Sequence, residues 1–465
     1  MSLITMPFSS SVLRRGEKSI IIYTSLQFYV YFSEHLWYNS IIAEITGKRI
    51  AFSLEGEPNM QALHTEICNS IEDHDRLSFI SVAEFIGSTK QEMSNYKAGK
   101  RGLSFRKLLR ISYLLYPTTQ KEVMRGWCLR LNTPEGIQQS FEYASITRDK
   151  ELLGKLLEKY KDEKGVLAKY ISVYSILYRY YMYEFEADQL ISELRKVKSL
   201  PEELYILAEI MKCYNYYFLG KYALMLETAQ EAEILVSELG ERRLFIKECY
   251  LHRIAEVLGN VSLFFNDIEA TRFYAFVIIN ADMCPKTVSD AYYLVGMTYL
   301  IEDKLKCIEY LRKRYEISKG TCDSGIIENA RRDLDFAKLY LSIKLSEDSD
   351  PILIKLQENR GSEFELRLIK EAAFQKGDDD FLTLLSAMAH GSVTKLHECL
   401  TKFLEDSNFY FASLAAAEVK KTGDNHFLVN EAIKYKNKTK GDVEYEEAYI
   451  KCFNRHGSIY RDITA

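Results

Sequence analysis

The chain has 465 residues, of which 47% are hydrophobic and 27% are charged, and its formal net charge is −5. This length allows a sizeable core and more than one structural unit. Its 22 Gly and only 7 Pro, set among Leu, Ile, Glu, Lys and Ala at helical spacing, argue against a strand-rich fold and predict an almost wholly helical, all-α protein. The nine Cys form no CxxC pair and no Cys/His cluster, which argues against a disulfide or metal framework and is typical of reduced thiols in a cytosolic protein.

The first 59 residues differ in texture from the rest of the chain. Their most apolar run, Ser19–Phe32, contains Ser, Thr and Gln. It is shorter than the roughly 20 residues of a membrane-spanning helix, so it is either a strand pair or a buried helix, and no membrane association is expected. The stretch EGEPNM places Glu-Gly-Glu just before Met60, and such codons are purine-rich, as a bacterial ribosome-binding site is. We therefore predict that residues 1–59 are an N-terminal extension and that Met60 is a possible natural start.

The next segment, residues 60–130, is basic although the whole chain is acidic. From Ile80 to Arg130 there are ten basic and three acidic residues, a local net charge of +7, which leaves −12 for the remainder. A chain polarised in this way indicates a small polyanion-binding domain attached to an acidic body.

The spacing of turn residues in this basic segment predicts a helix-turn-helix. A short amphipathic helix, Ser81–Gly87, ends at a glycine, and Thr89 then caps a second helix over Lys90–Ala98. Ser104 caps a third helix, which Pro117 terminates. In such a unit the second helix enters the major groove of DNA.

The glycine spacing and the apolar positions resemble the Cro/CI (XRE-type) helix-turn-helix. That resemblance implies that the second helix presents Lys90, Gln91, Glu92, Ser94, Asn95 and Lys97. Gln and Asn pair with adenine, and Lys reaches guanine or phosphate. Phosphate contacts are expected from Lys100, Arg101, Arg106 and Lys107. The alternative is an ordinary helical hairpin with a solvated basic face. One such module usually gives modest affinity, so a specific reader is expected to be a dimer on two half-sites.

Residues 131–435 are a succession of helix pairs. Small residues at Gly220, Gly259 and Gly296, each followed by aromatic and acidic positions, lie near the offsets of tetratricopeptide (TPR) repeats. The prediction is a TPR-like right-handed α-solenoid with a concave face, in which most Tyr, Phe and Met are repeat core. Such a face suits an extended peptide, because it offers amides to the peptide backbone and cations to its carboxylate.

Two parts of the chain carry a family resemblance. One is RKLLRISYLLYPTTQKEVMRGWCLRLNTPEGIQQSFEYASITRDKELLGKLL, and the other is HRIAEVLGNVSLFFNDIEATRFY followed by AYYLVGMTYLIEDKLKCIEYL. From about Met60 onward the chain resembles the arbitrium receptors (AimR) of temperate Bacillus phages, which belong to the Rap–PlcR type of peptide-sensing regulators.

The resemblance implies a transcription regulator in the bacterial host cytoplasm. It implies a homodimer that joins through the C-terminal repeats and binds an inverted-repeat operator beside a gene for a lysogeny-opposing regulator. It further implies that operator binding is lost when a short secreted peptide, of about six residues, occupies the groove.

Four groove positions carry over from the family to this sequence. The family's groove Asn falls on Asn260, and its groove Arg falls on Lys286, which keeps the charge and loses the bidentate fork. A second groove Asn falls on Asn408, and an acidic groove residue on Glu371, where the register is uncertain by a residue or two. The alternative for each of the four is a surface polar residue.

Other function classes remain open to different degrees. The body could be a TPR scaffold for a partner protein, or the chain could be a chromosomal quorum-sensing regulator. An enzyme is not expected, because the sequence has no P-loop, GxSxG, HExxH or dinucleotide glycine fingerprint, and GDDDF is typical of an inter-repeat loop. No cofactor or metal is expected. The tail, residues 436–465, opens polar and holds a possible last helix, YEEAYIKCFNRHG.

Overall fold

The computed structural model describes residues 60–436, apart from positions 183, 185–186, 241–242, 322 and 378. Every regular element within this described part is a helix, which confirms the all-α prediction. No helix of the described part is long and apolar enough to cross a membrane. The expectations for residues 1–59, with the start at Met60, and for the tail beyond residue 436 lie outside the described residues.

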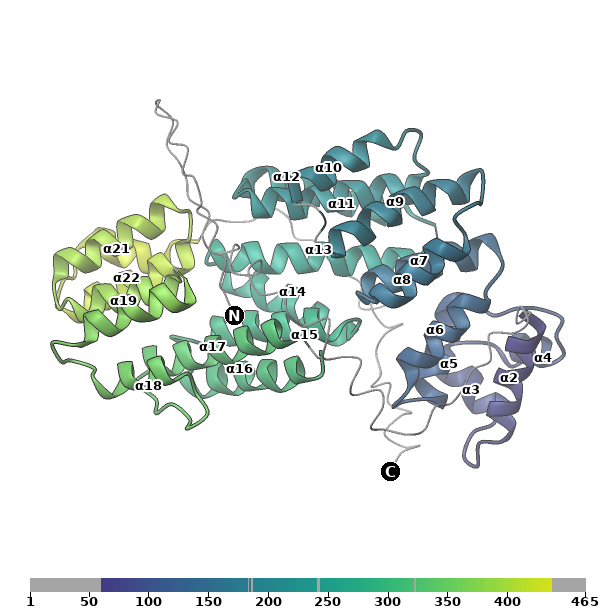
Figure 1. The fold of residues 1–465 in the computed structure, drawn as a ribbon, viewed down its shortest axis with the longest axis horizontal. Coiled ribbons are helices and arrows are strands. Elements are labelled where there is room, and N and C mark those ends of the chain that lie inside the picture. Colours follow the sequence, from purple (N-terminus) through teal and green to yellow (C-terminus); the bar gives the residue numbers. More distant parts are fainter. Residues whose placement is uncertain are drawn as a thin grey trace, which may run out of the picture.

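Five helices at one end form a compact head (Figure 1). They are α2 (Met60–Glu72), α3 (Phe79–Ile86), α4 (Lys90–Lys97), α5 (Phe105–Leu115) and α6 (Gln120–Arg130). Their apolar faces meet in a shared core that includes Val82, Met93 and Leu109.

The predicted helix-turn-helix is formed by α3 and α4, and its local signals act as expected. Gly87 closes α3 in the left-handed conformation, with φ 67° and ψ 41°, a region that a residue without Cβ adopts at no steric cost. The Thr89 side chain accepts a hydrogen bond from the backbone N–H of Glu92 and so caps α4. Ser104 stands at the N-cap position of α5, but its side chain makes no capping hydrogen bond.

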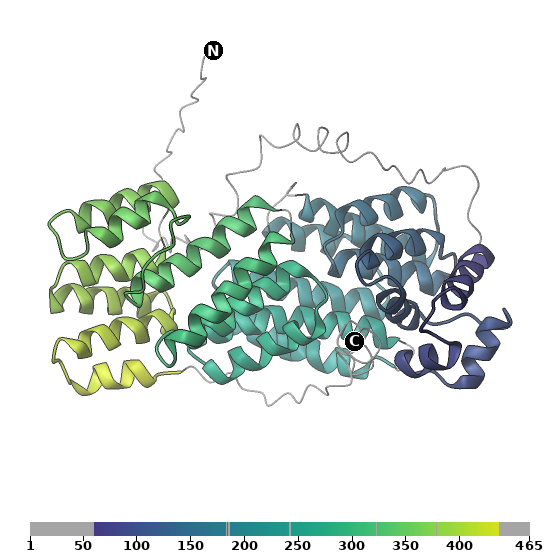
Figure 2. The ribbon, with the colours of Figure 1, turned by 90° about the horizontal axis from the view of Figure 1, so that it is seen from below.

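The remaining helices stack as an α-solenoid, with the head at one end and the C-terminal helices at the other (Figure 2). The first group is α7 (Pro134–Ile146), α8 (Lys150–Lys159), α9 (Val166–Tyr181), α10 (Ala187–Lys196), α11 (Glu202–Phe218) and α12 (Tyr222–Glu238). The middle group is α13 (Leu244–Phe264), α14 (Ile268–Ala281), α15 (Pro285–Thr298), α16 (Lys304–Lys319) and α17 (Ser324–Tyr340). The last group is α18 (Pro351–Glu358), α19 (Glu365–Lys376), α20 (Asp380–Ala389), α21 (Val393–Glu405), α22 (Phe409–Lys421) and α23 (Phe427–Lys434).

Three of the turns within helix pairs share one arrangement. In each turn, a residue with φ near 57° immediately precedes an Asp or Asn. The side chain of that Asp or Asn accepts a hydrogen bond from a backbone N–H of the next helix. The left-handed residues are Arg148, Asn266 and Ser407, and the caps that follow them are Asp149, Asp267 and Asn408. The repeat therefore lies in turn geometry as well as in helix length.

Close helix packing explains one of the small residues that the sequence singled out. A Cβ added at Gly296 of α15 would lie 2.8 Å from Cγ of Leu311 on α16. Any larger residue would force the two helices apart, because a packed interior has no room for the added atoms.

The head packs directly on the solenoid through α5 and α13. The Phe105 ring lies 4.7 Å from that of Phe245, centroid to centroid, and 5.9 Å from that of Tyr143 on α7. The neighbouring residue, Arg106, forms an ion pair with Glu248 of α13. Figure 1 shows α13 in the centre of the molecule, between the first group of helices and α14–α17.

Candidate functional site

The α4 helix presents a polar surface because its two apolar side chains face the head core. Met93 and Tyr96 are buried, whereas Lys90, Gln91 and Ser94 are exposed. Asn95 is partly exposed and accepts a hydrogen bond from the Gln91 side chain at 3.2 Å. The helix therefore carries donors and acceptors on the face that a recognition helix turns to bases.

Two further predicted contacts lie just beyond this helix. Lys100 and Arg101 are exposed, and no described residue forms an ion pair with either. Both are available to a phosphate backbone.

Two other predicted DNA contacts already have acidic neighbours. Lys97 pairs with Glu72 at 2.8 Å, with both side chains about half exposed. Lys107 pairs with Glu92 at 2.5 Å; this contact and a hydrogen bond from Ser88 lower the pKa of the Glu92 carboxyl. The Lys107–Glu92 pair ties α5 to α4 and so fixes the angle between them.

Arg106 does not lie with these cations. Its guanidinium donates to both carboxylate oxygens of Glu248, from Nε at 3.3 Å and from Nη2 at 3.0 Å. This pair lies at the interface between the head and the solenoid, so the phosphate contact predicted for Arg106 would compete with it.

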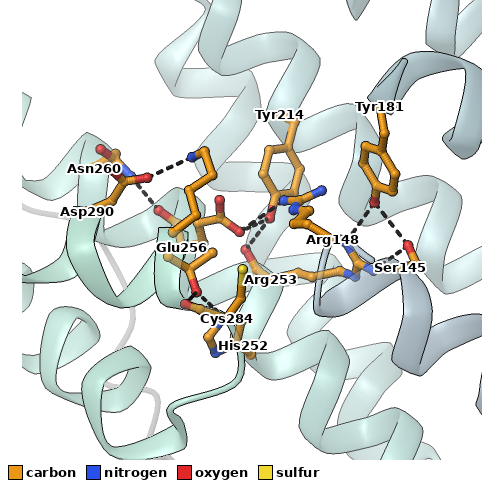
Figure 3. A network of polar contacts seen from close by, with 12 residues as sticks. Ser145, Arg148, Tyr181, Tyr214, His252, Arg253, Glu256, Asn260, Cys284 and Asp290 are labelled. Atoms are coloured by element: carbon orange, nitrogen blue, oxygen red, sulfur yellow. Dashed lines mark hydrogen bonds and ion pairs between the residues drawn. The ribbon is translucent and has the colours of Figure 1, made fainter. Parts of the chain in front are cut away.

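A second polar site lies along α13. Six residues from four places in the chain form what we call the inner polar cluster: Arg148, Tyr214, Glu256, Asn260, Lys286 and Asp290. Figure 3 shows Glu256 in contact with Asn260, Tyr214 and Arg148, with Asp290 lying beside Asn260. The sequence predicted Asn260 and Lys286, and the structure brings both into this one cluster.

Glu256 is the centre of the inner polar cluster. Its Oε2 accepts a hydrogen bond from Tyr214 at 2.7 Å and lies 3.5 Å from Nη2 of Arg148. Burial disfavours the ionised carboxyl, but the charges of Arg148 and Lys286 outweigh it and lower the pKa of Glu256. Glu256 is therefore a carboxylate at neutral pH, held by two cations.

The Asn260 and Lys286 side chains lie where a ligand can reach them. The Lys286 ammonium pairs with Asp290 one helical turn later at 2.7 Å, and the two side chains are 37% and 30% exposed. The Asp290 carboxylate raises the pKa of Lys286. Asn260 donates its amide to the backbone carbonyl of Glu256 at 2.8 Å, which leaves its side-chain oxygen facing outward from that bond.

A fully buried ion pair next to this cluster joins α13 to α7. Arg253 of α13 donates to Glu142 of α7 at 2.9 and 3.1 Å, and neither side chain is exposed. The same guanidinium donates to Ser145 at 2.9 Å. Because a buried charge that loses its partner is strongly destabilising, this pair fixes the position of α13 against the first helices of the solenoid.

Asn408 lies in a different place and has a structural role of its own. It is 4% exposed and caps α22 by accepting a hydrogen bond from the backbone N–H of Phe411 at 3.2 Å. Its amide donates to Asp380 of α20 at 2.8 Å. Burial and the neighbouring Asp379 raise the pKa of Asp380 to about 7.

Tyr217 of α11 connects these two regions electrostatically. Burial raises the pKa of Tyr217, and the carboxylates of Asp290 and Asp380 add to the effect. Glu371 is exposed on α19 and accepts a hydrogen bond from the Gln375 side chain one turn later.

Several of these residues escaped the sequence analysis. The i, i+4 spacing of Glu256 and Asn260 on one helix face was a usable signal. Arg148 and Tyr214 gave none, because Arg148 lies in the turn after α7 and Tyr214 lies on α11, far apart in the chain. In the described part of the chain, no group of His, Cys, Asp and Glu is arranged to hold a metal ion. The clustered charges and amides are suited to binding a polar ligand.

Comparison with known proteins agrees with this architecture. A family model described as AimR transcriptional regulator-like matches residues 120–421. The solved structure of selenomethionine phAimR is 20% identical, with a TM-score of 0.62, and the match covers 80% of this chain and 99% of that one. The phAimR-Ligand structure is also 20% identical, with a TM-score of 0.56, and the match covers 70% of this chain and 98% of that one. No curated protein matches the chain in sequence. At this identity the two structures establish a shared fold.

Proposed function

The chain belongs to the AimR transcriptional regulator-like family, and from that premise we propose that it binds an operator through its head and loses this binding when a short peptide occupies the inner polar cluster. The family membership makes it a transcription regulator. The operator, the peptide and the antagonism between them are our proposal.

The main support for this proposal is α13, because this one helix contacts the head and also contributes residues to the inner polar cluster. Glu248 near its start holds Arg106 of the head, and Glu256 and Asn260 further along belong to the inner polar cluster. At 1.5 Å per residue, the eight residues from Glu248 to Glu256 span about 12 Å of rigid helix. A ligand that shifts α13 at one end must therefore move the head contact at the other.

The chemistry of the inner polar cluster favours a peptide. Lys286 and Arg148 suit a carboxylate, Glu256 and Asp290 suit an ammonium or guanidinium group, and the Asn260 amide suits a peptide bond. The partial exposure of Lys286 and Asp290 supports a role in binding. In this proposal, Asp380 and Asn408 lie further along the same surface, and Glu371 takes no part.

The exposed residues of the head support operator binding. Lys90, Gln91, Ser94 and Asn95 would read bases, while Lys100 and Arg101, with contributions from Lys97 and Lys107, would hold phosphates. Contact of Lys97 and Lys107 with DNA would compete with their pairs to Glu72 and Glu92.

A homodimer would place two heads on an inverted repeat. Apolar side chains exposed on the C-terminal helices support a dimer contact there: Phe374 on α19 is 92% exposed, and Phe427 and Leu428 on α23 are 68% and 65% exposed. We further propose that the regulator acts in the bacterial host cytoplasm in the lysis–lysogeny decision of a temperate phage.

Genomic pull-down with the full chain tests the operator proposal. The expected result is a discrete inverted-repeat site, and binding spread evenly along the genome would contradict it. A short reading frame beside the gene, encoding a secretion signal and a terminal peptide, would supply the ligand. Titration of that synthetic peptide should then show saturable binding, which a scrambled peptide should not.

A further inference from the structure

A cavity of about 550 Å³ lies between α10 and α11, away from the inner polar cluster. Its lining residues are Ile191, Ser192, Arg195, Lys196, Lys198, Lys212, Asn215 and Tyr216, and we call it the α10–α11 pocket. It shares the helix α11 with the inner polar cluster but none of that cluster's residues. Its volume falls in the range of about 300–1,000 Å³ that small-ligand sites occupy.

The lining of the α10–α11 pocket is positively charged in an otherwise acidic body. Lys196 pairs with Glu193 at 2.5 Å and Lys212 pairs with Glu209 at 2.6 Å, each within its own helix. No ion pair to Arg195 or to Lys198 is formed by any residue that the structure describes. Two cations are therefore left to attract an anion into the pocket.

A buried amide in the wall adds an independent signal. Asn215 is only 8% exposed, and its Oδ1 has no hydrogen-bond partner among the described residues. A buried polar atom without a partner is destabilising, so such groups are rare in folded proteins and mark places where something else binds. The amide stands on α11 one turn beyond Lys212.

The pocket continues into an apolar hollow. A neighbouring cavity of about 160 Å³ shares Ile191, Arg195 and Lys212 with it. The hollow is otherwise lined mainly by apolar side chains, namely Leu194, Val197, Leu200, Tyr205 and Ala208, together with Glu209. A ligand that fills both spaces has a charged head and a short apolar chain.

We propose that the α10–α11 pocket binds a small organic oxyanion, a carboxylate or a phosphate ester with a short apolar chain. Arg195 and Lys198 hold the oxyanion, since the planar guanidinium of Arg pairs with two oxygens at once. The Oδ1 of Asn215 accepts a hydrogen bond from a hydroxyl or N–H next to the head, and the chain enters the apolar hollow. This second site does not depend on the operator or peptide proposed above.

Isothermal titration calorimetry on the full chain tests the proposal with hexanoate, 2-hydroxyhexanoate, hexyl phosphate and inorganic phosphate as probes and hexylammonium as the opposite-charge control. We expect saturable binding of a hexyl anion, weaker binding of inorganic phosphate and none of hexylammonium. A tighter hexanoate identifies a carboxylate as the natural head, and a tighter hexyl phosphate identifies a phosphate ester. No saturable binding of either hexyl anion would overturn the proposal.

Variants separate a built site from general charge attraction. Arg195→Ala should lower the affinity for the hexyl anion by at least about tenfold. Arg312→Ala, which removes an exposed cation on α16, should leave that affinity unchanged. Equal losses in the two variants would contradict the pocket. Asn215→Leu should raise the melting temperature of the free protein and lower the affinity for 2-hydroxyhexanoate more than that for hexanoate, because only the hydroxyl gives Asn215 Oδ1 a donor. If the melting temperature falls, or if the ligand affinity is unchanged, Asn215 is not part of the site and the pocket as proposed is wrong.

Discussion

Arg106 of α5 and Glu248 of α13 form a two-pronged ion pair across the boundary between the head and the solenoid, at 3.0 and 3.3 Å. The Glu248 side chain is fully buried, whereas that of Arg106 is 24% exposed. The pair orients the head on the helix that also carries the inner polar cluster.

Breaking this pair should destabilise the protein before any DNA is present. We expect Arg106→Ala to cost about 3 kcal/mol in unfolding free energy, because it removes a two-pronged ion pair from a fully buried carboxylate. Glu248→Gln in the Arg106→Ala background should recover part of the loss. Thermal unfolding of the four proteins of this double-mutant cycle measures the coupling. If the Arg106→Ala variant instead keeps wild-type stability and loses salt-dependent affinity for DNA, the result would support the predicted contact of Arg106 with phosphate.

Base and phosphate contacts of the head should respond differently to mutation. Asn95→Ala should cost about 1–3 kcal/mol on the operator and little on random DNA, because a base contact carries the selectivity. Arg101→Ala should weaken both DNAs and reduce the salt slope by roughly one. Fluorescence anisotropy across a salt series distinguishes the two. If the body is only a scaffold, neither variant should change its partner binding.

Lys286 should contribute to peptide affinity through its charge. Lys286→Ala should weaken the peptide about tenfold, as the loss of a charge-assisted hydrogen bond does. The matched control is Lys313→Ala, which removes a similar i, i+4 pair with Glu309 on α16. Calorimetric titration measures both variants. Equal affinity of the Lys286 and Lys313 variants would place the peptide elsewhere.

Asp380 should make stability depend on pH. Burial and Asp379 raise its pKa to about 7, with Lys402 and Asn408 opposing the shift and Asp406 adding to it. The folded protein thus holds a proton that the unfolded chain, with a carboxyl pKa near 4, releases. Stability is therefore lost as pH rises from about 4 to 7 and stays lower above that range.

Asp380→Asn removes this loss while keeping an acceptor for Asn408. We expect it to be more stable than wild type by roughly 1–3 kcal/mol at pH 8, with the difference vanishing near pH 4. Melting temperatures across this range check it, with Glu358→Gln, at an exposed position on α18, as the control. A pH-independent difference would contradict the buried titration.

The head was predictable from sequence because its signals are local. Gly87 and Thr89 set the turn between α3 and α4 within a few residues of themselves, and α4 ends within one residue of its predicted end. The solenoid followed from helical periodicity and from small residues such as Gly296. These features depend on neighbours in the chain or on the next helix.

The sites depended on contacts that sequence spacing does not contain. Arg106 contacts Glu248, which lies 142 positions away in the sequence. Sequence spacing does not show this contact, so the positive charge of Arg106 predicted binding to DNA. Asp380 lies in GDDDF, which the sequence predicts as a loop; Asp379 there does cap α20, but only the fold reveals that Asp380 is partly buried and bonded to Asn408. Asn408 resembled a ligand contact, although its position before a helix also fits the cap that the structure shows.

The coupling through α13 is tested most directly by the operator affinity of the full chain with and without saturating peptide. We predict that saturating peptide lowers the affinity of the wild type for the operator by at least about tenfold, which corresponds to about 1.4 kcal/mol of coupling. The operator should lower the affinity for the peptide by the same factor. Arg106→Ala should reduce that factor. An operator affinity that stays the same at every peptide concentration would contradict the account.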